Sequence, residues 1–297
     1  MLFRSIRDDF LRILPTSLER VNIQDVYPTL ETQAAYASSY VVDCFPLHLY
    51  GTLDVARLER ACQALVERYA ALRTIFHHFR QQKLLQVVLW KLQISLTVHQ
   101  CTSSTDTIDR VESLGQGEIT KHHDIKQPIT GFFLVQALHD QHHILLMRLS
   151  HGQYDGLCVR PLIQGIWQAY RSEAFPLQNE FKTHVQRCFE RRTSQAYIIW
   201  REILEAAPLP TLPLTPPMHD GKAKVGVFRR PLPGVNPLPG TTRASMIKAA
   251  WMETLWQETG REDVVFGQFV NAWTGTEGMI GPCMNVIPVR KIGRAHV

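Results

Sequence analysis

One loop governs the interpretation of this sequence: Ser150-His151-Gly152-Gln153-Tyr154-Asp155-Gly156. It follows an apolar run from His143 to Leu149, which is typical of a buried strand. After the loop, apolar residues recur at helical spacing from Leu157 to Tyr170. The loop is therefore predicted to join a buried strand to the N-terminus of a helix, where outward-pointing backbone amides favour developing negative charge.

The side chains of this loop suit proton transfer. A neutral imidazole at His151 can accept a proton from an attacking amine or hydroxyl, and Asp155 can lie against it across a tight turn. A purely structural interpretation stands beside this one, in which His151 is a hydrogen-bonded structural histidine and Asp155 only caps the helix. The loop alone does not decide between these alternatives.

The periodicity on both sides of the loop predicts a mixed α/β protein. Before the loop we expect a short amphipathic helix within 1–20, a helix over 53–72 capped by Asp54, strands over 85–90 and 94–99, a polar helix over 107–121, and a hairpin of strands 132–138 and 143–149. After it we expect a helix over 185–205 that buries Tyr197, Trp200 and Leu204, a proline-rich connection over 208–239 with a strand at 225–229, a helix over 243–259 ended by Gly260, and strands over 264–270 and 286–290.

These elements are interpreted as two α/β lobes. Residues 1–20 are a linker or short helix, residues 21–177 form the N-terminal lobe with the loop, and residues 178–291 form a partial C-terminal lobe. The last stretch, Ile292-Gly293-Arg294-Ala295-His296-Val297, resembles the translation of a sequencing-adapter read-through and is left out of the fold prediction.

Composition excludes several classes of function. The 297 residues are 45% apolar and 20% charged with a net charge of +5, and Lys and Arg are scattered, so we expect no nucleic-acid surface. The six dispersed cysteines suggest free thiols in a reducing compartment. Because no membrane-length apolar run or secretory signal is present, we expect a cytoplasmic protein with no membrane contact. The histidine pairs at 77–78 and 142–143 lack a third ligand at suitable spacing, so no metal site is expected.

The loop also resembles the HHxxxDG motif of condensation domains of nonribosomal peptide synthetases, with Ser150 at the position of the first His. Four further blocks resemble motifs of that family in the right order, and their sequences are most similar to those of fungal enzymes. They are Asp25-Val26-Tyr27-Pro28-Thr29-Leu30-Glu31-Thr32-Gln33, Arg68-Tyr69-Ala70-Ala71-Leu72-Arg73-Thr74-Ile75-Phe76, Asp263-Val264-Val265-Phe266-Gly267 and Gly281-Pro282-Cys283-Met284-Asn285-Val286-Ile287-Pro288-Val289-Arg290.

The resemblance implies a fold and an activity. The fold is two lobes like chloramphenicol acetyltransferase, arranged in a V around a tunnel, with the second lobe incomplete here. The activity is amide formation in secondary metabolite biosynthesis, by acyl transfer from a carrier-tethered thioester donor to a carrier-tethered amine. The partners are peptidyl or acyl carrier domains and neighbouring adenylation domains. The phosphopantetheine cofactor belongs to the carriers, so no cofactor is bound directly.

Roles follow residue by residue from the resemblance. His151 corresponds to the essential second His, acting as general base or as a group that positions the amine and stabilises the tetrahedral intermediate. Gly156 corresponds to the Gly whose backbone amide lies near the reacting carbonyl. Asp155 and Arg73 correspond to a structural Asp–Arg pair, Ser150 is structural at the site, and Asn285 is assigned to the substrate tunnel.

Two other functions remain open at this stage. One is a stand-alone or terminal acyltransferase of the same superfamily that uses CoA or a carrier. The other is a non-catalytic truncated remnant that docks a carrier, because nothing after Arg290 resembles the family's last motifs. Because strands near Arg290 would lack partners, we expect the 297-residue chain expressed alone to be poorly soluble or to aggregate, and residues 20–177 to be its better-ordered part.

Overall fold

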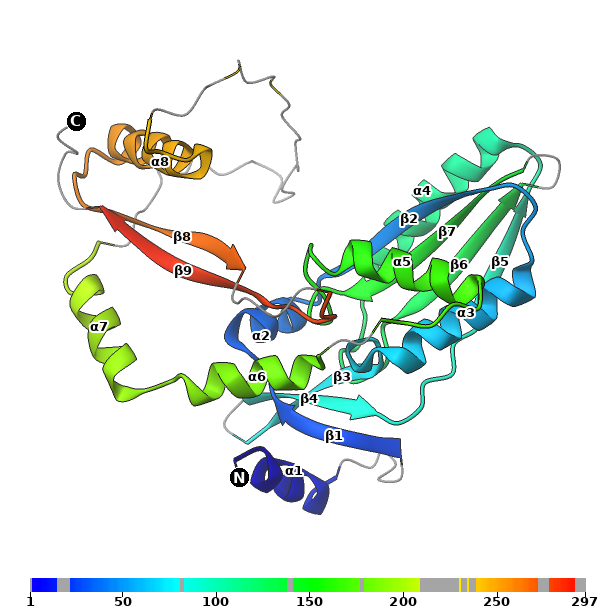
Figure 1. The fold of residues 1–297 in the computed structure, drawn as a ribbon, viewed down its shortest axis with the longest axis horizontal. Coiled ribbons are helices and arrows are strands. Elements are labelled where there is room, and N and C mark those ends of the chain that lie inside the picture. The colour runs from blue at the N-terminus through cyan, green and yellow to red at the C-terminus, as the bar shows by residue number, and fades with distance from the viewer. Residues whose placement is uncertain are drawn as a thin grey trace. The chain divides into compact units, whose positions relative to one another are not determined.

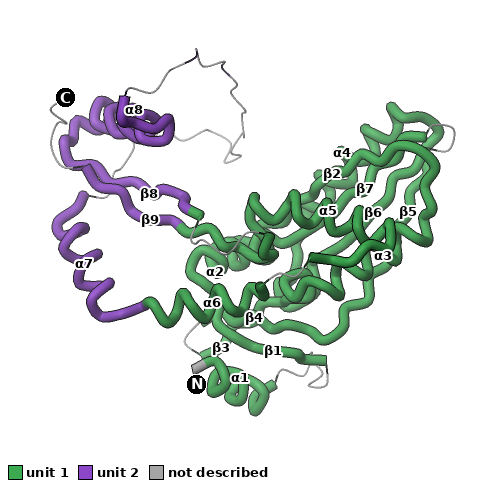
Figure 2. Tube along the Cα trace, in the orientation of Figure 1, with its two compact units in different colours: residues 1–191, 271–285 green, residues 192–270, 286–297 purple. Residues whose placement is uncertain are grey.

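The computed structural model describes residues 2–14, 22–80, 83–137, 141–176, 179–208, 230, 234, 239–271 and 278–291. The chain divides into two compact units (Figure 2). The first unit contains residues 1–191 and 271–285, and the second contains residues 192–270 and 286–297. The expected lobe boundary between residues 177 and 178 lies outside the described residues.

A four-stranded sheet forms the centre of the first unit (Figure 1). Its order is β2 (Val42–Tyr50), β7 (His142–Ser150), β6 (Gly131–Ala137) and β5 (Leu96–Cys101). β7 is antiparallel to both β2 and β6, whereas β5 is parallel to β6. The antiparallel β6–β7 pair confirms the predicted hairpin, although most of its turn lies outside the described residues.

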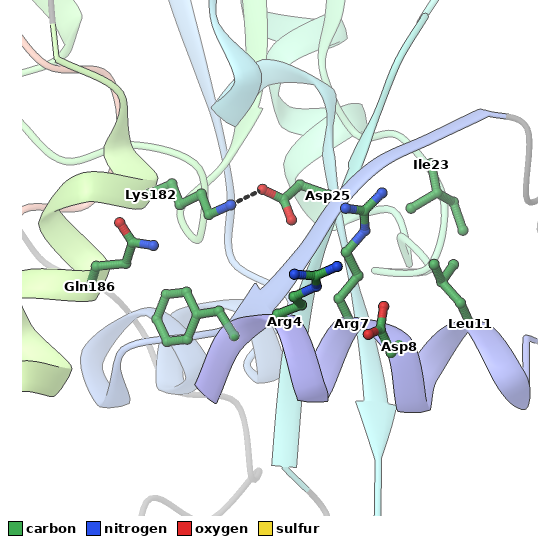
Figure 3. Close-up of a pocket in the computed structure, with 9 residues that line it drawn as sticks. Arg4, Arg7, Asp8, Leu11, Ile23, Asp25, Lys182 and Gln186 are labelled. Carbon is green, nitrogen blue, oxygen red and sulfur yellow. Dashed lines mark hydrogen bonds and ion pairs between the residues drawn. The ribbon is translucent and has the colours of Figure 1, made fainter. Parts of the chain in front are cut away.

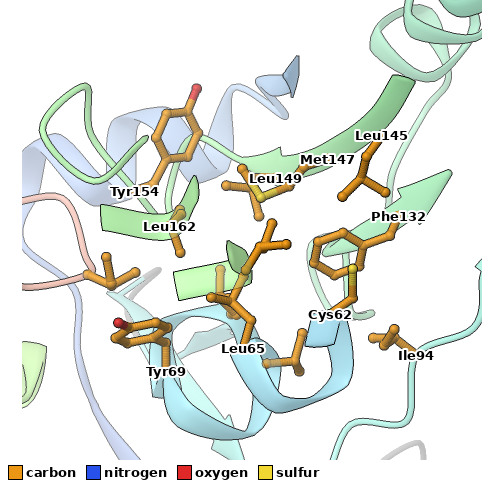
Figure 4. Close-up of a cluster of buried hydrophobic side chains, with 14 of the residues drawn as sticks. Cys62, Leu65, Tyr69, Ile94, Phe132, Leu145, Met147, Leu149, Tyr154 and Leu162 are labelled. Carbon is orange, nitrogen blue, oxygen red and sulfur yellow. The ribbon is translucent and has the colours of Figure 1, made fainter. Parts of the chain in front are cut away.

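Helices cover both faces of this sheet, because the strands bury side chains on alternate sides. α4 (Ser104–Thr120) packs through Val111 on the face that carries Val135 and Ile144. α3 (Val55–Arg68) and α5 (Val159–Tyr170) cover the opposite face, where Phe132, Leu134, Leu145, Met147 and Leu149 meet Leu65 and Leu162 (Figure 4). The largest hydrophobic cluster therefore lies directly beneath the end of β7 and the loop that follows it.

The helix predicted over 53–72 is confirmed as α3, with the expected N-cap. The Asp54 carboxylate accepts a hydrogen bond of 2.9 Å from the amide of Arg57. The helix approaches α5 closely at Gly165, where an added Cβ would lie 2.7 Å from Cδ1 of Leu65. This close approach fixes α5, and with it the end of the loop that precedes α5.

A second sheet in the first unit consists of β1 (Ile23–Pro28), β4 (Lys83–Leu89) and β3 (Thr74–Phe79), with β4 antiparallel to both neighbours. α1 (Leu2–Arg12) buries Phe10 against it, and α6 (Phe181–Glu190) packs near Tyr27 and Val88. A short 3-10 helix (Ala70–Arg73) leads into β3, and α2 (Glu31–Ser38) follows β1. The predicted N-terminal amphipathic helix is confirmed as α1.

The second unit contains α7 (Ser194–Leu204), α8 (Arg243–Thr259) and most of a two-stranded sheet of β8 (Val264–Asn271) and β9 (Met284–Lys291). α8 ends, as predicted, at Gly260, whose φ of 66° is left-handed. Arg290 ties these elements together. Its Nη2 and Nε lie 2.6 and 2.9 Å from the two carboxylate oxygens of Asp263, and its Nη1 donates to the carbonyls of Ile203 and Glu205.

The prediction of one helix over 185–205 is wrong. The chain forms α6 and α7, and the Thr193 hydroxyl accepts a hydrogen bond from the amide of Ala196, which starts a new helix. Tyr197 and Trp200 are 59% and 38% exposed, and no described residue of α7 is buried. Large apolar side chains commonly remain on protein surfaces, so aromatic character alone did not identify a buried face.

Two other sequence predictions fall on residues that are not described, namely the strand at 225–229 and the tail at 292–297. Among the described residues, no helix combines the length and apolar character needed to cross a bilayer.

Candidate active site

The loop after β7 is held in place by a buried polar network. Ser150 is 2% exposed, and its amide donates to Oε1 of Gln153 at 3.0 Å. The side-chain amide of Gln153 in turn donates to the carbonyl of Thr74 at 3.1 Å and to the hydroxyl of Thr130 at 3.2 Å. Because buried polar groups with partners define one geometry, this network fixes the loop's backbone. Ser150 accordingly has structural contacts at the site.

Gly152 allows the loop to lie close to the protein interior. Its carbonyl accepts a hydrogen bond of 2.9 Å from the side chain of Gln33 on α2, which is 1% exposed. A Cβ at position 152 would lie 2.9 Å from Cζ of Phe76 and 3.0 Å from Cβ of Ala37. Only glycine fits that space without displacing these neighbours.

His151 directly follows Ser150, the last residue of β7, and extends the pairing of β7 with β2 by one residue. Its amide donates to the carbonyl of Val41 at 2.9 Å. Asp43 pairs with Leu149 in the β2–β7 ladder, so the side chain at position 151 continues the face that carries Asp43. As a result, Nδ1 of His151 lies 3.1 Å from Oδ2 of Asp43.

The contact between His151 and Asp43 is electrostatic. Its length is that of a hydrogen bond, but Nδ1 is buried and lacks an aligned hydrogen-bond partner. We therefore describe it as an ion pair that forms whenever the imidazole is protonated. The His151 ring and the Tyr154 hydroxyl lower the pKa of the Asp43 carboxyl below its ordinary value, against the opposing effect of partial burial.

Two tyrosine rings pack against the imidazole, each nearly perpendicular to it. The ring of Tyr36 on α2 lies 4.1 Å from that of His151 at an interplanar angle of 83°, and the ring of Tyr154 lies at 4.9 Å and 88°. The Tyr154 hydroxyl donates to Oδ2 of Asp43. Burial, followed by this hydrogen bond, raises the pKa of Tyr154. The side chain of His151 stays 23% exposed, so the imidazole is held firmly yet remains accessible.

Asp155 points into the protein, where it binds backbone amides rather than a cation. It is 3% exposed, and its Oδ2 accepts hydrogen bonds from the amides of Cys283 at 2.8 Å and Met284 at 3.0 Å. Its Oδ1 accepts from the amide of Leu157 at 3.0 Å and from the thiol of Cys158 at 3.4 Å. Asp155 thus joins the loop to the segment before β9.

The pairing of Asp155 with Arg73 that the resemblance implied is not found. Arg73 is 7% exposed, and its guanidinium donates to the carbonyls of Val66, Leu89 and Glu67 and to the side chain of Gln24. Val66 and Glu67 belong to the last turn of α3, where carbonyl groups at a helix C-terminus attract a cation. Each of the two side chains therefore satisfies its charge with other groups.

The two remaining predicted site residues lie on either side of these contacts. Gly156 is exposed, and an added Cβ would meet nothing within 4 Å, so a substrate can approach the backbone there. Asn285 is exposed on β9, directly after the two amides that bind Asp155. The roles assigned to both residues stay predictions.

A cavity lies elsewhere in the first unit. Its volume is about 740 Å³, and it is bounded by α1, β1 and α6, with Arg4, Arg7, Asp25 and Lys182 in its lining (Figure 3). Lys182 forms an ion pair with Asp25 across it. No residue of the loop 150–156 lines this cavity, so it is separate from the candidate site. The described residues also contain no cluster of three His, Cys, Asp or Glu side chains suited to a metal ion.

Comparison with known proteins decides the family. A family model described as "Condensation domain" matches residues 22–293. The chain belongs to the condensation-domain family. This confirms the resemblance that the motifs indicated, and the match contains both the loop at 150–156 and the later block at 281–290.

Two curated proteins that are similar to this condensation domain come from species of Aspergillus. It is 33% identical over 298 residues to "Nonribosomal peptide synthetase hkm11" of Aspergillus hancockii, covering 97% of this chain and 22% of the relative. It is 32% identical over 304 residues to "Nonribosomal peptide synthetase 6" of Aspergillus fumigatus, covering 98% of this chain and 23% of the relative. The chain thus spans about a fifth of the length of these two relatives.

Solved structures support the mixed α/β fold. The structure titled "The crystal structure of holo T3CT" matches with a TM-score of 0.80 at 24% identity, covering 96% of this chain and 67% of that chain. The first condensation domain of the calcium-dependent antibiotic synthetase, in complex with a substrate analogue, matches with a TM-score of 0.65 at 16% identity, covering 92% of this chain and 71% of that one. At these identities the matches bear on the fold alone, and they confirm the predicted condensation-domain architecture.

Sequence reasoning missed the residues that surround His151. Asp43 and Tyr36 lie more than 100 positions before the loop, and no local motif connects them to it. Gln33 belongs to a block that was noticed for its resemblance, yet its contact with Gly152 was not foreseen. Only the register of β2 against β7 would have revealed Asp43, and the alternation of residues along one strand does not give that register.

Proposed function

We propose that this domain catalyses amide formation by acyl transfer, as the condensation domain of a nonribosomal peptide synthetase. The observation that carries the proposal is the His151 imidazole, which is accessible, held between two tyrosine rings and placed 3.1 Å from the Asp43 carboxylate. Family membership and the names of the relatives support the same conclusion. They offer no support for a CoA-dependent or non-catalytic alternative over this one.

In the proposed reaction, the acceptor amine attacks the carbonyl carbon of the donor thioester. A C–N bond forms, the C–S bond breaks, the amine gives up one proton, and the departing thiolate takes one. Since Nδ1 of His151 faces Asp43, the nitrogen left for the substrate is Nε2. His151 receives the amine proton at Nε2 and returns it to the sulfur, or it holds the amine by a hydrogen bond at the same atom. The backbone at Gly156 is the proposed neighbour of the carbonyl oxygen.

The partners follow from this chemistry. Donor and acceptor arrive as thioesters on the phosphopantetheine arms of carrier domains, and adenylation domains of the same synthetase load those carriers. We infer a cytoplasmic setting for the same reason, because the carriers are charged with ATP-derived energy inside the cell. No metal ion or further cofactor enters any step that these residues perform.

The test is loss of the imidazole. In the full-length protein, with carrier-loaded donor and acceptor, His151→Ala is expected to lower amide formation by about a hundredfold or more, the usual effect of losing a general acid-base group. The circular dichroism spectrum should not change, because the side chain is partly exposed. His78→Ala, an exposed histidine on β3, serves as the matched control and should retain normal turnover. Near-normal turnover of His151→Ala would exclude the proposed role.

A further inference from the structure

The geometry points to Asp43 as a positioning residue for His151: its carboxylate faces Nδ1, keeps Nε2 directed to the substrate and stabilises the imidazolium formed on proton uptake. The inference rests on the proposed function, since it concerns how His151 performs its step. It assigns to β2 a part in the site that neither the loop motif nor the family blocks indicated.

The first support is the strand register. Asp43 pairs with Leu149, and the hydrogen bond from the His151 amide to the carbonyl of Val41 extends the ladder one residue beyond β7. Side chains two residues apart on a strand share a face, so positions 43 and 151 become diagonal neighbours. Backbone pairing therefore sets the 3.1 Å distance between Nδ1 and Oδ2, and a flexible side chain alone does not.

The second support is that Asp43 is itself held and charged. The Tyr154 hydroxyl donates to the same oxygen, Oδ2, that faces the imidazole. Tyr154 is 4% exposed and packs edge-on against Phe45 as well as His151, so its hydroxyl has a fixed position. The lowered pKa of Asp43 keeps the carboxylate ionised throughout the neutral range.

The third support comes from the groups around the imidazole. The titratable side chains that face His151 in the described residues are Tyr36 from α2, Asp43 from β2 and Tyr154 from its own loop. Of these, only Asp43 is anionic at neutral pH. Asp155, which the four-residue spacing placed against His151, instead binds the amides of Cys283 and Met284. The carboxylate that accompanies the histidine therefore comes from β2.

The physical consequence is a dependence of proton transfer on the charge at position 43. An opposite charge within about 4–6 Å favours the protonated form of a base. Removing that charge destabilises the imidazolium and leaves the ring free to turn. Binding of the carriers should not depend on it, because Asp43 interacts with the protein's own imidazole and phenol groups.

The kinetic test compares three substitutions in the full-length protein. Asp43→Asn is expected to lower kcat about tenfold while KM for each loaded carrier stays within about twofold. The ascending limb of its pH–rate profile should move to lower pH, because the negative charge that favours the imidazolium is gone. Asp43→Glu restores the charge and should return that limb to its original position. Asp109→Asn, an exposed aspartate on α4, is the matched control and should match the unsubstituted protein.

A spectroscopic test does not require turnover. With ¹⁵N-labelled histidine, the ring signals of His151 are assigned by their absence in His151→Ala and followed through a pH titration of the chain. Asp43→Asn should change the balance of ring tautomers of His151, because the carboxylate that faces Nδ1 is gone. Tyr154→Phe keeps the ring and removes only the hydroxyl, and should shift the same signals less.

The outcomes separate this inference from the proposed function. If His151→Ala abolishes turnover but Asp43→Asn leaves kcat, the pH–rate profile and the ring signals unchanged, the positioning role is wrong and the proposed function stands. If His151→Ala retains turnover, the proposed function fails whatever Asp43→Asn does. If Asp43→Asn raises KM and leaves the pH–rate profile in place, Asp43 contributes to substrate binding and the inference is overturned.

Discussion

Replacing Asp155 by Ala should destabilise the first unit strongly, because its carboxylate is a buried acceptor for amides from distant parts of the chain. The amides of Cys283 and Met284 lose their acceptor, whereas the exposed Leu157 amide can turn to water. Hydrogen bonds to a charged group contribute about 1.5–3 kcal/mol each, so these two bonds predict a loss of about 3–6 kcal/mol in the free energy of unfolding.

Urea denaturation followed by circular dichroism measures this loss. Asp54→Ala is the matched control, since Asp54 accepts one amide hydrogen bond at an exposed helix N-cap and its removal should cost about 1 kcal/mol. Hydrogen exchange adds a local readout: the Cys283 and Met284 amides should exchange much faster in Asp155→Ala, while the Arg57 amide should not. Asp155→Asn should restore stability only in part, because its amide oxygen can accept the Cys283 and Met284 amides while its NH₂ group faces the Leu157 amide.

The same measurement tests the absence of an Asp155–Arg73 pair. If the two residues do not interact, the losses from Asp155→Ala and Arg73→Met should add to within about 0.5 kcal/mol in the double variant. A coupling of several kcal/mol would show that the two charges do interact in solution. A loss from Asp155→Ala no larger than that from Asp54→Ala would refute the argument that amides of the 283–284 segment depend on this carboxylate.

Two further predictions follow from the loop and its neighbours. Gly152→Ala should lower the free energy of unfolding by about 1–3 kcal/mol, because its Cβ would overlap buried Phe76 and Ala37; Gly156→Ala, whose Cβ meets nothing within 4 Å, should change stability little, and equal effects in urea denaturation would contradict this. The pKa of the Asp43 carboxyl is lower in the folded protein than in the unfolded chain, where it is about 4. The ionised carboxylate therefore stabilises the fold above about pH 4, and this stabilisation is lost as the pH falls through the folded-state pKa. The stability difference between the unsubstituted chain and Asp43→Asn should therefore shrink below about pH 4, and a difference that is constant from pH 7 to pH 3 would contradict the assignment.

The elements that were predicted well have strong periodicity and few tertiary requirements. α3 was recognisable because its buried residues recur at helical spacing behind an Asp54 cap, and β6 and β7 are apolar because both of their faces are covered. β2 was missed. It contains Pro46 and lies at the edge of its sheet, where a proline is tolerated and alternate side chains are exposed, so its sequence lacks the usual strand pattern.

The candidate site was predicted in its centre but not in its surroundings. The loop from Ser150 to Gly156 was identified from its residues and from the family motif, and the structure places it between β7 and α5 as expected. The partner of Asp155 was assigned to Arg73 from the family resemblance, but here backbone amides satisfy the buried carboxylate. Backbone amides occur at almost every residue, and Asp43 belongs to no motif that links it to the loop. The local sequence therefore does not predict the contacts of Asp155 with the amides or of His151 with Asp43.

The hydrogen bond between Asp155 and Cys283 also sets an order of events during synthesis. The two residues are 128 positions apart, so the loop leaves the ribosome well before the amides that bind it. At a translation rate of about 5–20 residues per second, roughly 6–25 s pass between the synthesis of Asp155 and that of these amides. During that interval β2 and β7 can pair and place His151 beside Asp43, while Asp155 still lacks its hydrogen bonds from the amides of Cys283 and Met284. The contact between His151 and Asp43 can therefore form before the hydrogen bonds between Asp155 and the 283–284 amides. A nascent chain stalled shortly before Cys283 should contain the His151–Asp43 contact and lack those hydrogen bonds.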